Sequence, residues 1–296
     1  MPADSSRPGD TAAGRAAGAR FVLVSFHAHP DDEALLCGGT LARAAAEGHR
    51  VVLVVATLGE SGLTAGGMRG DELARCREDE LQASARALGV ARTVVLGYAD
   101  SGMQGECGGD DAFSRTPVEP AARRLADLLE QEDADVLTVY DPAGGYGHPD
   151  HRAVSVVGVR AAELAGTPVV LEATVEREAL IRVVRLLRRL PRMPSGLAQQ
   201  DFGAAFTPRA RITHRVDVRR HLGAKRAALA AHTSQQSGDP GTRTVALLAR
   251  LPRSLFRAAL GTEWFVEHGR PGGERLDDVF ASVRARTAEP TGGRPR

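Results

Sequence analysis

The sequence predicts an α/β fold built on a mostly parallel sheet with helices on both faces. Two observations support this class. Short apolar runs rich in β-branched residues recur between residues 20 and 175, and segments with apolar residues at helical spacing separate them. Strands that alternate with helices of this length are joined by right-handed crossovers, which place the strands parallel in one sheet. The expected architecture is therefore Rossmann-like.

The expected elements follow one another in a regular order. The predicted strands are 20–28, 50–58, 93–98, 135–141 and 167–175. The predicted helices are 31–48, 71–89, 118–132, 150–165, 176–190 and 218–231. The first strand, RFVLVSFHA, is too short for a helix and is rich in β-branched and aromatic residues. The helix after it begins with three acidic residues, where the helix dipole favours negative charge, and ends at Gly48.

The chain is expected to divide into four regions. Residues 1–19 are rich in Ala, Gly, Ser, Pro and Asp and hold no apolar run, which predicts a disordered leader without a signal peptide or membrane span. Residues 20–175 form the α/β core, 176–286 a smaller C-terminal subdomain packed on it, and 287–296 a flexible tail. Along 176–190 arginines alternate with apolar residues, and we interpret this segment as a solvated surface helix rather than a membrane-bound one.

Charge and cysteine content argue against several classes of protein. The 296 residues include 38 Lys and Arg against 37 Asp and Glu, so no net field attracts nucleic acid or an acidic membrane surface. The three cysteines, Cys37, Cys76 and Cys107, contain no CxxC pair, which suits neither a disulfide framework nor a thiolate zinc site. We expect a cytoplasmic protein without nucleic-acid partners or stable membrane association. The sequence is compatible with both a monomer and a homo-oligomer.

Two histidine-containing motifs follow predicted strands. HPDDE at 29–33 comes after the strand 20–28, and YGHPDH at 146–151 comes soon after the strand 135–141. The carboxyl ends of parallel strands share one edge of a sheet, and ligand sites form at that edge. The two motifs are therefore expected to converge on one site.

The two motifs together offer ligands for a divalent metal. His29 and Asp32 stand three residues apart in the first motif, and His151 can complete the set from the second. Two imidazoles and one carboxylate leave a position open for water, which is typical of a catalytic zinc site. Iron(II) uses the same ligand set, so Zn²⁺ is the first expectation and Fe²⁺ the alternative.

The segments around these motifs resemble the LmbE/PIG-L family of N-deacetylases, and within it the deacetylases and amidases of the mycothiol pathway. The resemblance is carried by VSFHAHPDDEALLCGGTLARAAAEGHRV, YDPAGGYGHPDH, DSGM at 100–103 and KRAALAAHTSQ at 225–235. It implies that His29, Asp32 and His151 hold the metal and that Asp31 is the general base. Such a carboxylate can take a proton from water whose pKa the metal has lowered.

The resemblance also implies roles for residues around the metal. It places Tyr146 and His148 at the developing oxyanion, with Asp150 orienting His148 through a contact whose negative charge would favour the imidazolium. It assigns Arg77 and Asp100 to the binding of sugar hydroxyls or other polar groups of the substrate.

These roles imply zinc-dependent hydrolysis of an amide, most simply N-deacetylation of an N-acetylglucosamine-containing small molecule. An amidase acting on a larger thiol conjugate or a natural-product amide is the alternative, because the segments 168–208 and 241–265 depart from the mycothiol deacetylase pattern. An iron oxygenase has no need of Asp31 and His148 as an acid and base pair. A metal-binding protein without catalytic activity would not be expected to keep the acid and base residues in addition to the metal ligands.

Overall fold

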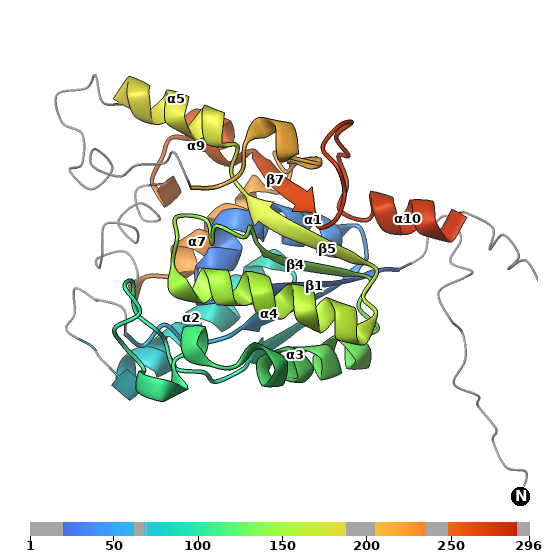
Figure 1. Ribbon diagram of the computed structural model, residues 1–296. Coiled ribbons are helices and arrows are strands. Elements are labelled where there is room, and N and C mark those ends of the chain that lie inside the picture. Colours follow the sequence, from blue (N-terminus) through green and yellow to red (C-terminus); the bar gives the residue numbers. More distant parts are fainter. Residues whose placement is uncertain (1–19, 62–67, 69, 188–204, 235–247, 289–296) are drawn as a thin grey trace, which may run out of the picture.

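A computed structural model describes residues 20–61, 68, 70–187, 205–234 and 248–288, and the account below concerns these residues (Figure 1). Within them one seven-stranded sheet has the order β3-β2-β1-β4-β5-β7-β6. The strands are β1 Val22–His27, β2 Arg50–Val55, β3 Arg92–Val95, β4 Val136–Tyr140, β5 Val169–Thr174, β6 His214–Asp217 and β7 Thr262–Glu267. The predicted leader, 1–19, and most of the predicted tail lie outside the described residues.

The first five strands pair in parallel, whereas β7 runs antiparallel to β5, and β6 antiparallel to β7. The predicted mostly parallel sheet is thus confirmed. Part of the region 176–286, predicted as a C-terminal subdomain, continues this sheet through β7 and β6. Predicted strands 50–58 and 93–98 end earlier than expected, because the residues after β2 and β3 leave the sheet as loops.

Helices connect and cover the strands. They are α1 Gly38–Ala46, α2 Gly70–Leu88, α3 Val118–Glu132, α4 Pro149–Ala165, α5 Arg177–Leu187, α7 Leu222–Ala231, α9 Arg253–Leu260 and α10 Ala281–Ala288. Short helical turns are η1 Glu33–Cys37, η2 Gly109–Asp111, η3 Phe113–Arg115 and η4 Arg209–Arg211. The helix predicted at 31–48 is therefore divided: its first turn, η1, is a π-helix, and α1 follows it.

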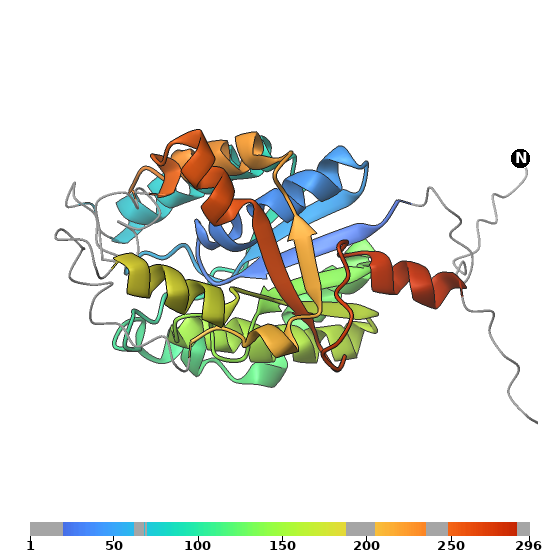
Figure 2. The ribbon, with the colours of Figure 1, turned by 90° about the horizontal axis from the view of Figure 1, so that it is seen from above.

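Helices lie on both sides of the sheet (Figure 2), and each face of the sheet packs into a separate apolar core. Alternate residues of β1 point to opposite faces, so Val24 packs under α3 and α4 while Leu23 packs under α1 and α7. Both side chains are fully buried. The chain thus has helices on both faces of the sheet, as the alternation of elements predicts.

The arginine-rich helix α5 buries little of its surface. Val184 is buried, whereas Val183 and Leu186 are 53% and 63% exposed. Arg182 lies 3.5 Å from the carboxylate of Glu176. Residues 188–190 of the predicted helix lie outside the described residues. Among the described helices, none has the length and apolar character needed to cross a membrane.

A buried ion pair joins the C-terminal strands to the first helix. Lys225 Nζ on α7 donates to Glu263 Oε1 on β7 at 2.5 Å, and both side chains are almost completely buried. The same carboxylate accepts the backbone N–H groups of Gly39 and Thr40 at 2.8 and 2.7 Å. These N–H groups belong to the first turn of α1 and have no partner within the helix. Glu263 therefore caps α1 and neutralises Lys225 at once.

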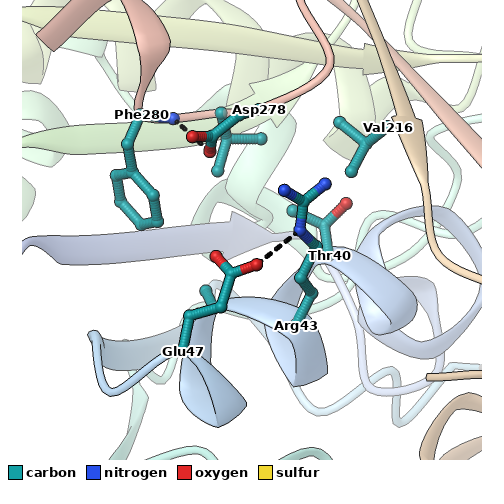
Figure 3. A pocket seen from close by; sticks show the side chains of 8 residues that line it. Thr40, Arg43, Glu47, Val216, Asp278 and Phe280 are labelled. Carbon is teal, nitrogen blue, oxygen red and sulfur yellow. Dashed lines mark hydrogen bonds and ion pairs between the residues drawn. The ribbon is translucent and has the colours of Figure 1, made fainter. Parts of the chain in front are cut away.

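We expect Lys225→Met to lower the free energy of unfolding by about 3–5 kcal/mol, because it leaves the buried Glu263 carboxylate without its counter-ion. Chemical denaturation would measure the change. The matched control is Glu47→Gln, which removes the exposed Arg43–Glu47 pair (Figure 3) and should cost less than about 1 kcal/mol. Equal losses in the two variants would contradict the assigned role of Lys225.

Candidate metal centre and active site

The two histidine motifs meet at the carboxyl ends of β1 and β4. The ring centroid of His148 lies 4.7 Å from that of His29 and 5.0 Å from that of His151. His29 follows β1 by two residues, and His148 caps the N-terminus of α4. The motifs converge at the expected edge of the sheet.

Backbone geometry shapes the second loop. Gly144 and Gly147 adopt φ values of +67° and +98°, which side chains other than glycine rarely allow. Asp141, directly after β4, accepts the N–H of Gly145 at 3.1 Å and the hydroxyl of Thr174 at 2.5 Å. Pro149 then occupies the first position of α4, where its missing N–H has no cost.

The Asp32 carboxylate lies between the two predicted histidine ligands. Its Oδ2 is 3.5 Å from His29 Nδ1 and 3.3 Å from His151 Nε2. All three side chains are buried. Within the described residues, Asp32 Oδ2 and both ring nitrogens of His151 have no hydrogen-bond partner. Buried polar atoms of this kind are normally paired, and a metal ion between Asp32 Oδ2 and His151 Nε2 would satisfy these two atoms together.

The other nitrogen of His29 faces a second set of carboxylates. His29 Nε2 lies 3.2 Å from Asp150 Oδ2 and 3.4 Å from Asp100 Oδ1. Asp150 also accepts the N–H of Ser101 at 3.0 Å and its hydroxyl at 2.5 Å, and Asp100 accepts the N–H of Gly102 at 2.9 Å. A metal-binding histidine commonly donates its second N–H to such a carboxylate, which fixes the ring.

The local electrostatic field favours positive charge. Burial opposes protonation of His29, but the nearby carboxylates of Asp100, Asp150 and Asp32 raise its pKa well above the ordinary value. Burial likewise opposes ionisation of Asp32, yet His151 and His29 hold its pKa well below the usual range. A divalent cation would supply the same positive charge at this place.

A second histidine arrangement shares the site. His29, His148 and His151 each offer a nitrogen, and the three nitrogens lie within 4.8 Å of one another. Asp100 and Asp150 form a further group with His29 and His148. The carboxylates of Asp100 and Asp150 are already hydrogen-bonded, whereas Oδ2 of Asp32 is not. Asp32 belongs to neither group, but its Oδ2 lies 3.5 Å from His29 Nδ1 and 3.3 Å from His151 Nε2.

His148 is oriented by the backbone of Asp150. The backbone N–H of Asp150 donates to His148 Nδ1 at 3.2 Å, while the Asp150 side chain is used by His29 and Ser101. This contact differs from the charge-assisted pair expected from the sequence. Burial, with the nearby His29 and His151, lowers the pKa of His148 to about 4. His148 is thus a neutral ring in the metal-free protein, and since Nδ1 accepts, Nε2 carries the proton.

Asp31 and Tyr146 stand beside this cluster. Asp31 is half-buried, and burial together with the charge of Asp32 raises its pKa to about 7. Tyr146 is 43% exposed, and its ring centroid lies 5.1 Å from that of His151 and 6.3 Å from that of His148. Tyr146 therefore borders the histidine cluster on its solvent side.

The two predicted substrate-binding residues have different surroundings. Asp100 reaches the histidine cluster directly through His29. Arg77 is buried on α2, and its guanidinium donates to the carbonyl oxygen of Gly59 in the loop after β2. The charges of Asp31 and Asp100 both act on Arg77. Arg77 therefore lies at the same edge of the sheet and is not a solvated surface residue.

Sequence reasoning did not identify two residues that support the site. Ser101 anchors Asp150, and Tyr140 stacks on His151 with ring centroids 4.1 Å apart and planes 3° apart. The hydroxyl of Tyr140 also accepts the N–H of Ala28 at 3.1 Å. Ser101 lies in DSGM and Tyr140 begins YDPAGGYGHPDH. Both residues therefore lie in segments that resemble the family, and this resemblance could have identified them. From its position in an apolar strand alone, Tyr140 would be predicted to be an ordinary aromatic residue of the core.

A separate small pocket lies away from these residues (Figure 3). Its lining includes Thr40, Arg43 and Phe280, with Arg43 paired to Glu47 at 2.8 Å. None of the predicted site residues lines it. This pocket therefore does not compete with the histidine cluster as an active site.

Comparison with known proteins places the chain in a family. The PIG-L family model, described as GlcNAc-PI de-N-acetylase, matches residues 24–162. A protein of Streptomyces griseus subsp. griseus, named 1D-myo-inositol 2-acetamido-2-deoxy-alpha-D-glucopyranoside deacetylase, is 39% identical over 295 residues, covering 89% of this chain and 89% of that protein.

Solved structures share the fold at lower identity. N,N'-diacetylchitobiose deacetylase from Pyrococcus horikoshii is 20% identical with a TM-score of 0.52, covering 85% of this chain and 84% of that chain. The 4-carboxy-2-hydroxymuconate hydratase of Pseudomonas putida KT2440 is 18% identical with a TM-score of 0.54, covering 86% of this chain and 99% of that chain. A deacetylase and a hydratase thus share this fold, so the fold alone does not identify the family. The family assignment therefore depends on the relatives found by sequence. The chain belongs to the LmbE/PIG-L family of N-deacetylases, which are hydrolases of amide bonds.

Proposed function

We propose that this protein removes the acetyl group from the amide nitrogen of an N-acetylglucosamine-containing small molecule. The observation that carries the proposal is the Asp32 carboxylate oxygen, which is buried between His29 and His151 without a hydrogen-bond partner among the described residues. The name of the Streptomyces griseus relative supports an acetylated amino sugar as the substrate. The expected products are acetate and a free amine.

His29, Asp32 and His151 would hold the metal, and Zn²⁺ is the proposed ion, with Fe²⁺ as the alternative that shares this ligand set. When bound, such an ion polarises the amide carbonyl and lowers the pKa of water. Asp150 and Tyr140 support this ligand set, the first through His29 Nε2 and the second by stacking on His151.

Asp31 is the proposed general base. A pKa of about 7 allows it to accept a proton from the attacking water and to return that proton to the leaving nitrogen. Its neighbour Asp32 faces His29 and His151 and is therefore reserved for the metal. One carboxyl group can thus perform both proton transfers of the hydrolysis.

His148 and Tyr146 are the proposed donors to the developing oxyanion. The neutral His148 presents its Nε2–H, because Nδ1 is occupied by the N–H of Asp150. Preorganised donors at such a position stabilise charge that develops in the transition state. Arg77 and Asp100 are proposed to bind polar groups of the sugar.

The substrate proposal is tested by incubating the zinc-loaded protein with a panel of N-acetylated compounds and labelling released primary amine. The panel includes N-acetylglucosaminyl-inositol, N-acetylglucosamine and a bulky thiol-conjugate amide. We expect amine release from the N-acetylglucosaminyl compounds. Release from the bulky amide alone would support the amidase alternative, and no release from any member would contradict the proposal.

Variants of the ligands and of the base should separate metal binding from turnover. His29→Ala, Asp32→Ala and His151→Ala each remove a proposed ligand, so the purified variants should contain less than about a tenth of the wild-type metal. Asp31→Asn should keep the metal but lose at least about 100-fold in kcat, because it removes the base. Metal analysis and initial rates measure both. Metal loss in Asp31→Asn with retention in Asp32→Asn would reverse the two assignments.

Asp150→Asn should act on metal affinity. The change removes the negative charge that faces His29 Nε2, and loss of such an outer contact weakens metal binding by about 10–100-fold. Competition with a fluorescent chelator would measure the dissociation constant. Glu47→Gln is the control, since Glu47 is an exposed residue directly after α1 and is paired with Arg43, and its metal affinity should equal that of the wild type. Unchanged affinity in Asp150→Asn would exclude this role.

A further inference from the structure

One segment that resembles the family has no part in the proposed reaction. It is KRAALAAHTSQ, of which residues 225–234 are described. The segment includes most of α7 and continues through His232, Thr233 and Ser234. His232 is completely buried and is 199 positions distant in the sequence from its hydrogen-bond partner, Glu33.

Glu33 connects this segment to the catalytic loop. Its Oε1 accepts His232 Nε2 at 2.8 Å and the hydroxyl of Ser84 on α2 at 2.5 Å. Its other oxygen, Oε2, accepts the backbone N–H of Asp31 at 2.9 Å. Glu33 and His232 are both fully buried. The carboxylate thus uses both oxygens to join three elements of the fold.

The bond to Asp31 holds an unusual backbone conformation. Asp31 has φ +105°, one of three positive values among the described residues other than glycine. Such a conformation is strained for a residue other than glycine and persists only where the surroundings determine it. The N–H bond to Glu33 is one restraint, and the carbonyl of Asp31 accepts the N–H groups of Ala34 and Leu35 at 3.1 and 3.2 Å. Glu33 also begins the π-helical turn, a feature frequent at functional sites.

Docking of α7 alone does not explain this pair. Apolar side chains could attach α7 to the sheet at no cost of buried charge, as Leu229 already does. Thr233 and Ser234 also attach the segment independently, because their hydroxyls donate to Glu80 at 2.6 and 2.7 Å. His232 instead binds Glu33, and Glu33 binds the backbone N–H of Asp31.

We propose that His232 and Glu33 are positioning residues for Asp31: His232 fixes the Glu33 carboxylate, which in turn holds the Asp31 backbone in its positive-φ conformation. This inference rests on the proposed role of Asp31 as the base. The conformation separates two consecutive carboxylates, so that Asp32 faces His29 and His151 while Asp31 is free for proton transfer.

The test compares His232→Ala with His232→Gln and with the control Ser234→Ala in the zinc-loaded full-length protein. His232→Ala should lower kcat about 10–100-fold, the range for loss of an outer contact, with KM within about threefold and metal content unchanged. The Gln amide can donate to Glu33 and should restore part of kcat. Ser234→Ala loses one buried hydroxyl of the same segment and should keep kcat within about twofold.

A double-variant cycle tests the route through Asp31. Adding His232→Ala to Asp31→Asn should cause no further loss of kcat. Additive losses would overturn the proposal, as would wild-type kcat in His232→Ala. If His232→Ala does not fold, Glu33→Ala removes the carboxylate that accepts the Asp31 N–H, and wild-type kcat in that variant would overturn the proposal.

Crystal structures of His232→Ala and Ser234→Ala, or of Glu33→Ala if the first does not fold, give a measurement that does not depend on activity. We expect Asp31 to leave the positive-φ region in the His232 or Glu33 variant and to keep it in Ser234→Ala. An unchanged Asp31 backbone in the first would overturn the positioning role. Absence of amide hydrolysis by the wild type would contradict the proposed function alone, because the backbone measurement would still decide the positioning role.

Discussion

Two consecutive carboxylates with different surroundings are the constraint on which the site depends. Asp32 has its oxygen between His29 and His151, whereas the charges that lower the pKa of Asp31 are those of His232 and Arg77. A backbone rotation between the two residues gives their carboxylates different surroundings. The positive φ of Asp31 supplies that rotation, and the first turn of the following helix is π-helical directly after it.

Helix α2 connects this constraint to the rest of the fold. Arg77, Glu80 and Ser84 are spaced by three and four residues, so they lie on one face of the helix, and all three are buried. Arg77 faces the loop after β2, Glu80 binds Thr233 and Ser234, and Ser84 binds Glu33. A polar stripe that would normally be solvated is therefore internal here, and α7 closes over it.

Two kinds of feature could be predicted from the sequence: strands and helices with a local pattern, and residues that directly follow a strand. The five parallel strands could be recognised because each is a short apolar run between helical segments, and the placement of His29 and His148 follows from the ends of β1 and β4. Pairing of β7 with β5 could not be predicted, because antiparallel addition at a sheet edge has no local pattern. The contact of Glu33 with His232 joins residues 199 positions apart, and a histidine beyond a helix end has no signal of its own. Asp150 does contact His148, but the sequence cannot show that it does so through its backbone N–H and not through its carboxylate.

The orientation of His148 has a consequence for proton transfer in the proposed reaction. Since His148 Nδ1 accepts an N–H, the neutral ring has a single proton on Nε2, and it can donate a hydrogen bond but cannot readily give that proton away. In the proposed reaction, Asp31 would then transfer the proton that it has taken from water to the leaving nitrogen. The charge of Asp32 helps to raise the pKa of Asp31 to about 7. A cation bound at Asp32 would offset that charge and favour the ionised form of Asp31. In the proposed mechanism, metal binding at Asp32 would therefore also favour the ionised form of the neighbouring base, Asp31.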